Sequence, residues 1–141
     1  MLALSRRWQA ELGEEPFEPD WDRIFAMERA GAAMIWTARS LQGALVGYMF
    51  VTFTNGIFFS STRFARILAG YLAPEWRAGT TGLRYIRSTL DAIDQLGAFR
   101  IEWETNDRFE PDDSGRSRLA GLLKRLGFEQ VGTVMRRRDG R

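Results

Sequence analysis

The stretch "APEWRAGTTGLRYI", residues 73–86, contains the pattern that decides the fold. A proline and an aromatic-arginine pair lead into Gly79 and Gly82, which flank Thr80 and Thr81, and an apolar pattern of helical period follows. The first turn of a helix presents unpaired N–H groups and about half a positive charge, which suits a phosphate. These residues alone leave two interpretations open: a backbone cradle for a phosphorylated cofactor, or a plain turn between a strand and a helix.

Known nucleotide motifs do not fit this stretch. It lacks the closing Gly-Lys-Ser/Thr of a nucleotide-triphosphate loop and the spacing of the dinucleotide fingerprint. In the cradle interpretation, Gly79 and Gly82 let the backbone come close to a phosphate or adopt positive φ. The two threonine hydroxyls would add donors, and Arg77 would add a positive charge.

Length and composition predict one globular domain. The chain has 141 residues with 45% hydrophobic and 27% charged residues, so we expect a single domain over 1–141 with a real core. The apolar run "ALVGYMFVTF" is about half as long as a membrane-spanning helix. The N-terminus lacks the small-residue cleavage site of a signal peptide. We therefore expect no membrane partner and a cytoplasmic location.

Two absent residue types restrict the chemistry. The chain has no cysteine, which excludes disulfides and thiolate nucleophiles, and no histidine, the commonest general base and transition-metal ligand. Any catalysis must therefore use carboxylates, tyrosines, hydroxyls and backbone amides, and no metal site is expected. The formal net charge is only +2, and the arginines are scattered, which argues against nucleic-acid binding.

Hydrophobic period and turn residues predict an α/β domain with the element order ααβββαβαβ. The expected helices are 2–12, 21–31, 82–96 and 118–128, and the expected strands are 32–39, 44–53, 66–74, 99–105 and 129–137. Asp20 is expected to cap the second helix, and Leu83, Ile86, Leu90 and Ile93 to form the buried stripe of the third. The strand-helix-strand unit in the middle predicts a parallel pair with a crossover helix.

The segment "YLAPEWRAGTTGLRYI" resembles the acetyl-CoA loop of the GNAT-type N-acetyltransferases, which reads Arg/Gln-x-x-Gly-x-Gly/Ala and opens a helix. Arg77 fits the first position and Gly82 the last, whereas Thr80 stands where the family has its middle glycine. "LKRLGFEQVG" is similar to the family's closing Leu-Gly-Phe signature. The resemblance implies a mixed twisted sheet with splayed central parallel strands and helices on both faces, without the family's first strand.

Two further segments, "PDWDRIFAMERAG" and "LVGYMFV", look most like GNAT-like proteins encoded by tailed bacteriophages. This narrower resemblance implies a location in the host cytoplasm or in the virion.

The resemblance implies transfer of an acetyl group from acetyl-CoA, as cosubstrate, to an amine of a small molecule, a protein N-terminus or a lysine. The thioester and pantetheine would contact the chain around Tyr71 and Leu72, and Tyr71 is the most plausible catalytic tyrosine near the thioester. Glu104 or Glu102 would be the general base through water, and Asn106 would orient the acceptor or the pantetheine. The pyrophosphate would lie on the loop residues Arg77, Gly79, Thr80, Thr81 and Gly82.

The sequence also departs from the family where catalysis needs residues. The tyrosine that protonates the departing thiolate in the family lies five residues before the Phe of Leu-Gly-Phe, and that position is Leu123 here. The strand before the loop carries no carboxylate. A second hypothesis is therefore a catalytically silent binding or structural protein, contacting other proteins of a phage virion. Such a role predicts an exposed apolar patch, for example around Phe58, Phe59 and Phe64.

Overall fold

The computed structural model describes residues 2–12, 18–56, 61–103 and 118–131. Its elements follow one another as α1 (Leu2–Leu12), α2 (Trp21–Arg29), β1 (Ala33–Arg39), β2 (Leu45–Asn55), β3 (Arg63–Leu72), the short 3-10 helix η1 (Pro74–Trp76), α3 (Thr81–Gln95), β4 (Ala98–Trp103) and α4 (Arg118–Arg125). The predicted order ααβββαβα is confirmed. Residues 129–131, which we expected to begin a last strand, are not in a strand, and that strand's remainder lies outside the described residues.

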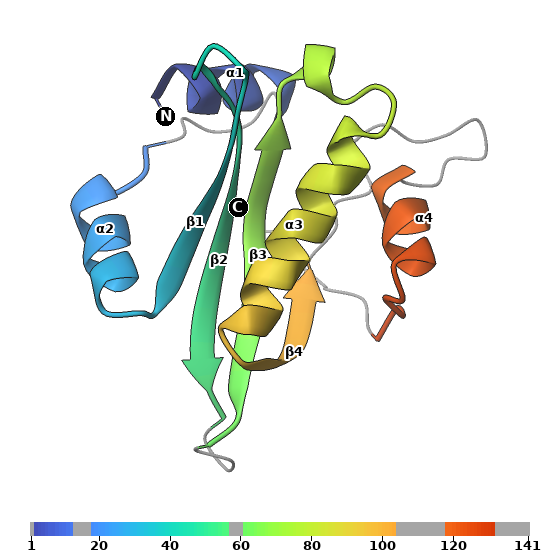
Figure 1. Cartoon of the computed structure of the whole chain (residues 1–141). Helices are drawn as coiled ribbons and strands as arrows, with labels where there is room; N and C mark the ends of the chain where they lie inside the picture. Colours follow the sequence, from blue (N-terminus) through green and yellow to red (C-terminus); the bar gives the residue numbers. More distant parts are fainter. Residues whose placement is uncertain (1, 13–17, 57–60, 104–117, 132–141) are drawn as a thin grey trace, which may run out of the picture. The chain divides into compact units, whose positions relative to one another are not determined.

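The four strands form one mixed sheet in the order β1-β2-β3-β4 (Figure 1). The pairs β1–β2 and β2–β3 are antiparallel, and β3–β4 is parallel across the crossover helix α3. The predicted parallel pair is therefore confirmed. β1 is an edge strand in the described part of the chain.

Helix α3 covers one face of the sheet (Figure 1). The indole Nε1 of Trp36 in β1 donates a hydrogen bond to Ser88 Oγ of α3 over 3.2 Å, and Met49 is the partner of Trp36 in β2. Because side chains alternate along a strand, this assigns every second residue of β2 to the α3 face. The buried strand residues of that face are Met49, Val51, Phe53, Ala65 and Ile67.

Helix α1 contributes to the core of the opposite face. Tyr48 and Tyr71 are partners across β2 and β3, and both point away from α3 because they alternate with the residues facing it. They form a buried cluster with Leu4 of α1 and Ala73, against which Trp76 packs. Helices therefore lie on both faces of the sheet, as expected.

The ends of the helices follow the signals in the sequence. Asp20 Oδ1 accepts a hydrogen bond from the backbone N–H of Arg23 over 3.0 Å, which confirms the predicted cap of α2. Gly97 follows α3 with a φ of +76°, a left-handed conformation that glycine adopts at little cost. The buried stripe of α3 differs from the prediction: it consists of Tyr85, Ile86, Thr89 and Ile93.

The chain divides into two compact units. Met1–Glu104 contains the sheet and α1 to α3, and Thr105–Arg141 contains α4. In the second unit, the N–H of Phe128 donates to the carbonyl of Leu123 over 3.0 Å, closing the C-terminus of α4. Among the helices that the structure describes, none is both long enough and apolar enough to cross a bilayer.

Candidate cofactor-binding site

The loop between β3 and α3 brings a strand end next to a helix start (Figure 1). After β3, the chain forms the single turn η1, passes through Gly79 and begins α3 at Thr81. Gly79 has a φ of +66°, and no atom lies within 4 Å of the place where a Cβ would stand. The glycine is therefore required by its backbone angle and not by crowding.

This loop leaves a run of backbone donors without acceptors. Within the described part of the chain, the N–H groups of residues 78–83 make no close hydrogen bond, although Gly79 and Thr80 form a turn. The next N–H, of Arg84, donates to the carbonyl of Thr80 over 2.9 Å. The threonine side chains do not cap the helix either, since Thr80 precedes α3 without a side-chain hydrogen bond. Adjacent free amides at the start of a 15-residue helix form a site suited to an anionic group.

Four of the predicted pyrophosphate residues lie at these free amides. Gly79, Thr80 and Thr81 are exposed, and Gly82 is half-buried. A Cβ at Gly82 would lie 3.6 Å from the carbonyl oxygen of Arg77 and 3.9 Å from Leu72 Cδ2, so it points toward the protein. A small side chain at Gly82 is therefore compatible with the loop.

Arg77 points toward α1. Its Nη2 donates to Glu11 Oε2 over 2.7 Å, and its Nε donates to the carbonyl of Leu72 over 2.6 Å. Its guanidinium carbon lies 5.3 Å from the centre of the Tyr71 ring. The cation that we expected at a phosphate is thus paired with a carboxylate of the N-terminal helix.

Tyr71 belongs to the same group of contacts. Its side chain is buried, and its hydroxyl donates to Glu11 Oε1 over 2.7 Å. Burial, together with this hydrogen bond to a carboxylate, raises the pKa of Tyr71 to about 12. The hydroxyl proton is therefore held toward Glu11, and a group with such a pKa gives up its proton less readily than an ordinary tyrosine.

β3 runs on beyond its last described pair with β4. Among the described residues, the parallel pairing reaches Ile67 and Trp103, while β3 continues to Leu72. Ala73 N–H donates to the carbonyl of Val46 in β2. Since backbone groups alternate, the N–H groups of Leu72 and Gly70 point away from β2, toward the β4 side of β3. These amides could receive an acyl oxygen or an extended ligand.

The register of β3 also shifts at this place. Ala69 and Ile67 are partners of consecutive residues in β2, so Leu68 has no partner there. Such bulges redirect the backbone and recur near active sites.

The predicted carboxylates are not assembled next to the loop by any described contact. Glu102 pairs with Arg66 over 2.9 Å, and its side chain is 40% exposed. It lies on the face opposite α3, because its partner Arg66 alternates with the buried Ile67. Glu104 and Asn106 lie outside the described residues.

The remaining expectations have mixed outcomes. Leu123, at the position of the family's tyrosine, is buried on α4. Phe58 and Phe59 lie outside the described residues, and Phe64 is half-buried with the Arg100 guanidinium 5.8 Å from its ring centre. No group of three or more carboxylates that could hold a metal ion occurs among the residues that the structure describes.

Sequence reasoning missed two residues of this region. Gly70 could have been found, because a glycine inside a strand indicates a bulge or a close approach, and its Cβ would lie 3.3 Å from Met49 Cε and 3.6 Å from Trp103 Cζ2. Glu11 had no such signal. Its pattern on α1 is that of an ordinary exposed position, and only the tertiary contact reveals its partners.

Comparison by sequence finds no match, either to a family model or to a curated protein. Comparison by structure finds acetyltransferases. An acetyltransferase from Trypanosoma brucei has a TM-score of 0.68 and 16% identity, with 96% of this chain and 92% of that chain covered. The aminoglycoside acetyltransferase meta-AAC0020 from an uncultured soil metagenomic sample, in complex with sisomicin, has a TM-score of 0.70 and 16% identity. The alignment covers 98% of this chain and 88% of that chain.

A third similar structure is a "predicted acetyltransferase with acetyl-CoA" from Clostridium acetobutylicum, with a TM-score of 0.67 and 14% identity over 96% of this chain and 86% of that chain. At identities this low, the similarity supports the fold alone. It agrees with the mixed sheet, the parallel β3–β4 pair and the loop that opens α3. The chain therefore has the fold of the GNAT-type acetyltransferases.

Proposed function

We propose that the protein is an acetyl-CoA-dependent N-acetyltransferase that acts on an amine. The observation that carries this proposal is the run of backbone N–H groups at residues 78–83 for which no close acceptor is found in the described part of the chain, at the start of α3 and beside the end of β3. A pyrophosphate on these amides would place the rest of the cofactor along β3, where the N–H groups of Gly70 and Leu72 point away from β2. The acetyltransferase structures that share the fold support the same general activity.

Acetyl transfer from a thioester to an amine requires few side chains of the protein, because the thioester is already activated. Acetyl-CoA would supply an activated thioester, and the acetyl group passes to the amine nitrogen as the carbon–sulfur bond breaks. Backbone N–H groups of β3 would polarise the thioester carbonyl, as an oxyanion hole does. Glu102 or Glu104 would accept the ammonium proton through water. The departing thiolate would take its proton from water or from Tyr71, whose hydroxyl must first leave Glu11.

The cradle can be tested by a substitution whose effects on stability and on binding have opposite signs. Thr81 is the first, exposed residue of α3, so Thr81→Glu should keep or raise the thermal stability through the helix dipole. The same carboxylate would repel a pyrophosphate and weaken acetyl-CoA binding by about tenfold or more. Thr81→Gln is the matched neutral variant and should bind more tightly than Thr81→Glu, because it brings no negative charge to the cradle. Calorimetric titration of acetyl-CoA measures the affinity of the wild type and of both variants, and thermal unfolding measures their stability. The proposal is wrong if the wild type does not bind acetyl-CoA at millimolar concentration.

Specific observations also favour a second candidate, a GNAT-like protein that binds without catalysis. Leu123 replaces the family's acid, the Tyr71 hydroxyl is engaged by Glu11, and Glu102 is paired with Arg66. This candidate includes the role in a phage virion, which rests on the sequence segments alone. Acetyl-CoA binding without turnover of any amine in a broad panel, unchanged by Glu102→Gln and Glu104→Gln, would favour it over the enzyme.

A further inference from the structure

The carboxylate of Glu11 connects α1 to the loop that would hold the cofactor. It accepts hydrogen bonds from Tyr71 at the end of β3 and from Arg77 in the loop, each over 2.7 Å. The Arg77 and Glu11 side chains are 32% and 34% exposed, so this ion pair is only partly screened by water. One carboxylate thus joins three separate segments of the chain.

The guanidinium of Arg77 is held on more than one side. Its Nε donates to the Leu72 carbonyl over 2.6 Å, Nη2 donates to Glu11, and its plane lies near the Tyr71 ring. A planar guanidinium bound at two edges has little freedom to turn. The backbone of Arg77 is also fixed, because its N–H donates to the carbonyl of Pro74 over 3.1 Å. The free amides of residues 78–83 begin at the next residue.

We propose that Glu11 is a positioning residue for the cofactor cradle, acting through Arg77. This inference rests on the proposed function. Glu11 keeps Arg77 in place, Arg77 holds the loop against the end of β3, and the amides of residues 78–83 are thereby pre-organised for a pyrophosphate. Affinity for acetyl-CoA then depends on a helix that contributes no group to the cradle itself.

The opposite role, in which Glu11 competes with the cofactor for Arg77, predicts the reverse effect. Removal of the carboxylate would then release the cation to a phosphate and tighten binding. The hydrogen bond to the Leu72 carbonyl argues against this, because it keeps Arg77 turned toward β3. Loss of Glu11 should therefore loosen the loop and weaken binding.

The experiment is calorimetric titration of acetyl-CoA into the wild type and variants. Glu11→Ala should weaken binding by about fivefold to tenfold, and Arg77→Met by a similar factor. The double variant should be no weaker than the weaker single variant, because both act through one contact. Arg7→Gln is the matched control: it breaks the exposed pair of α1 with Glu75, whose oxygens lie 2.9 and 3.1 Å from the guanidinium, without touching Arg77. Its affinity should stay within about twofold of the wild type.

Each outcome of the titrations either supports or overturns the positioning role of Glu11. If wild-type protein binds acetyl-CoA and Glu11→Ala binds equally or more tightly, the inference is wrong and the proposed function stands. If the wild type does not bind, both fail. If Glu11→Ala is unfolded by circular dichroism, Glu11→Gln replaces it, since the amide oxygen keeps an acceptor for Tyr71 but loses the charge. Equal losses in Arg7→Gln and Glu11→Ala would mean that α1 docking in general matters, and would overturn the specific role of Glu11.

Discussion

Gly47 and Gly82 differ in the space around them, and this difference decides which of the two positions can hold a side chain. A Cβ at Gly47 in β2 would lie 2.9 Å from the carbonyl oxygen of Tyr71 and 2.9 Å from Leu72 Cδ1. The first of these is backbone and cannot move aside without shifting β3. A Cβ at Gly82 would make only ordinary contacts of 3.6 and 3.9 Å. Crowding thus requires glycine at position 47 and not at position 82.

Alanine at the two positions should therefore change stability in opposite directions. Gly47→Ala should lower the free energy of unfolding by about 1–3 kcal/mol, because the β2–β3 contact must open. Gly82→Ala should leave it unchanged or raise it by up to about 1 kcal/mol, because alanine favours the helix. Urea unfolding followed by circular dichroism measures both. A tolerated Gly47→Ala would contradict the close contact.

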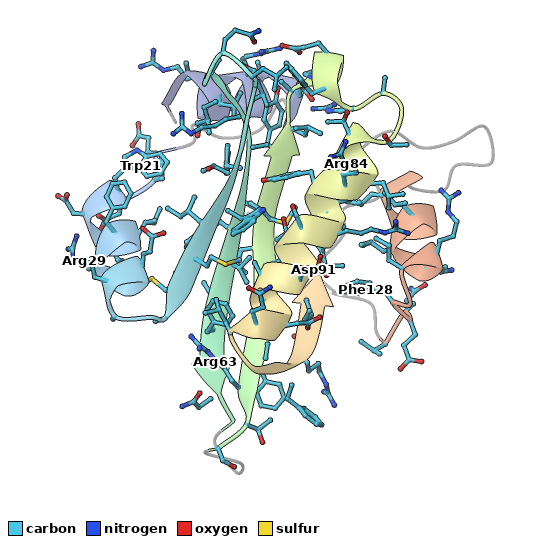
Figure 2. The ribbon with its side chains drawn as sticks, in the orientation of Figure 1. Trp21, Arg29, Arg63, Arg84, Asp91 and Phe128 are labelled. Carbon is cyan, nitrogen blue, oxygen red and sulfur yellow. The ribbon has the colours of Figure 1, made fainter. Side chains whose placement is uncertain are left out.

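At the scale of elements, one arginine binds the ends of two helices. Arg63, at the start of β3, donates from Nη2 to the carbonyl of Gly31 after α2 over 2.6 Å, and from Nη1 to the carbonyl of Leu96 after α3 over 3.1 Å (Figure 2). Its guanidinium carbon lies 4.2 Å from the centre of the Phe53 ring. A cation at the carboxyl end of a helix satisfies free carbonyls and complements the helix dipole.

Arg63→Met should cost about 2 kcal/mol of unfolding free energy, since two carbonyls lose a charged donor and Phe53 loses its contact with the guanidinium. Arg66→Met is the matched control in the same strand. It breaks only the exposed pair with Glu102, so it should cost less than about 1 kcal/mol. Chemical denaturation compares the two, and equal costs would show that the Arg63 contacts do not stabilise the protein.

The order of the elements and most of their bounds could be predicted because hydrophobic period, caps and turn glycines are local signals. The bounds of β3 were wrong: it was expected at 66–74 and spans Arg63–Leu72, because Pro74 belongs to η1. The stripe of α3 was only partly predictable. Tyr85 and Thr89 can be buried because the Tyr85 hydroxyl donates to the Trp36 carbonyl and the Thr89 hydroxyl to the Tyr85 carbonyl. At the site, the glycines and threonines of the loop could be recognised from the sequence. The pairing of Arg77 with Glu11 could not be predicted, because Glu11 lies 66 residues away and no local pattern links the two.

At the scale of the whole molecule, the chain buries every tyrosine that it has. Tyr48, Tyr71 and Tyr85 are the three tyrosines of the sequence, and they are 4%, 3% and 8% exposed. Burial raises the pKa of all three: that of Tyr71 reaches about 12, with the hydrogen bond to Glu11 as a further cause. The core around β2, β3 and α3 therefore resists formation of a tyrosinate.

An alkaline titration should show this as a link between ionisation and unfolding. A tyrosine has a pKa of about 10 in the unfolded chain, so the raised folded values give stability that is complete below pH of about 10. That stability is lost as the pH rises from about 10 toward 12, the folded pKa of Tyr71. Tyrosinate absorbance should therefore stay absent near pH 10 and appear together with the loss of the circular dichroism signal. A tyrosine that ionises near pH 10 while the dichroism remains native would contradict the burial of that side chain.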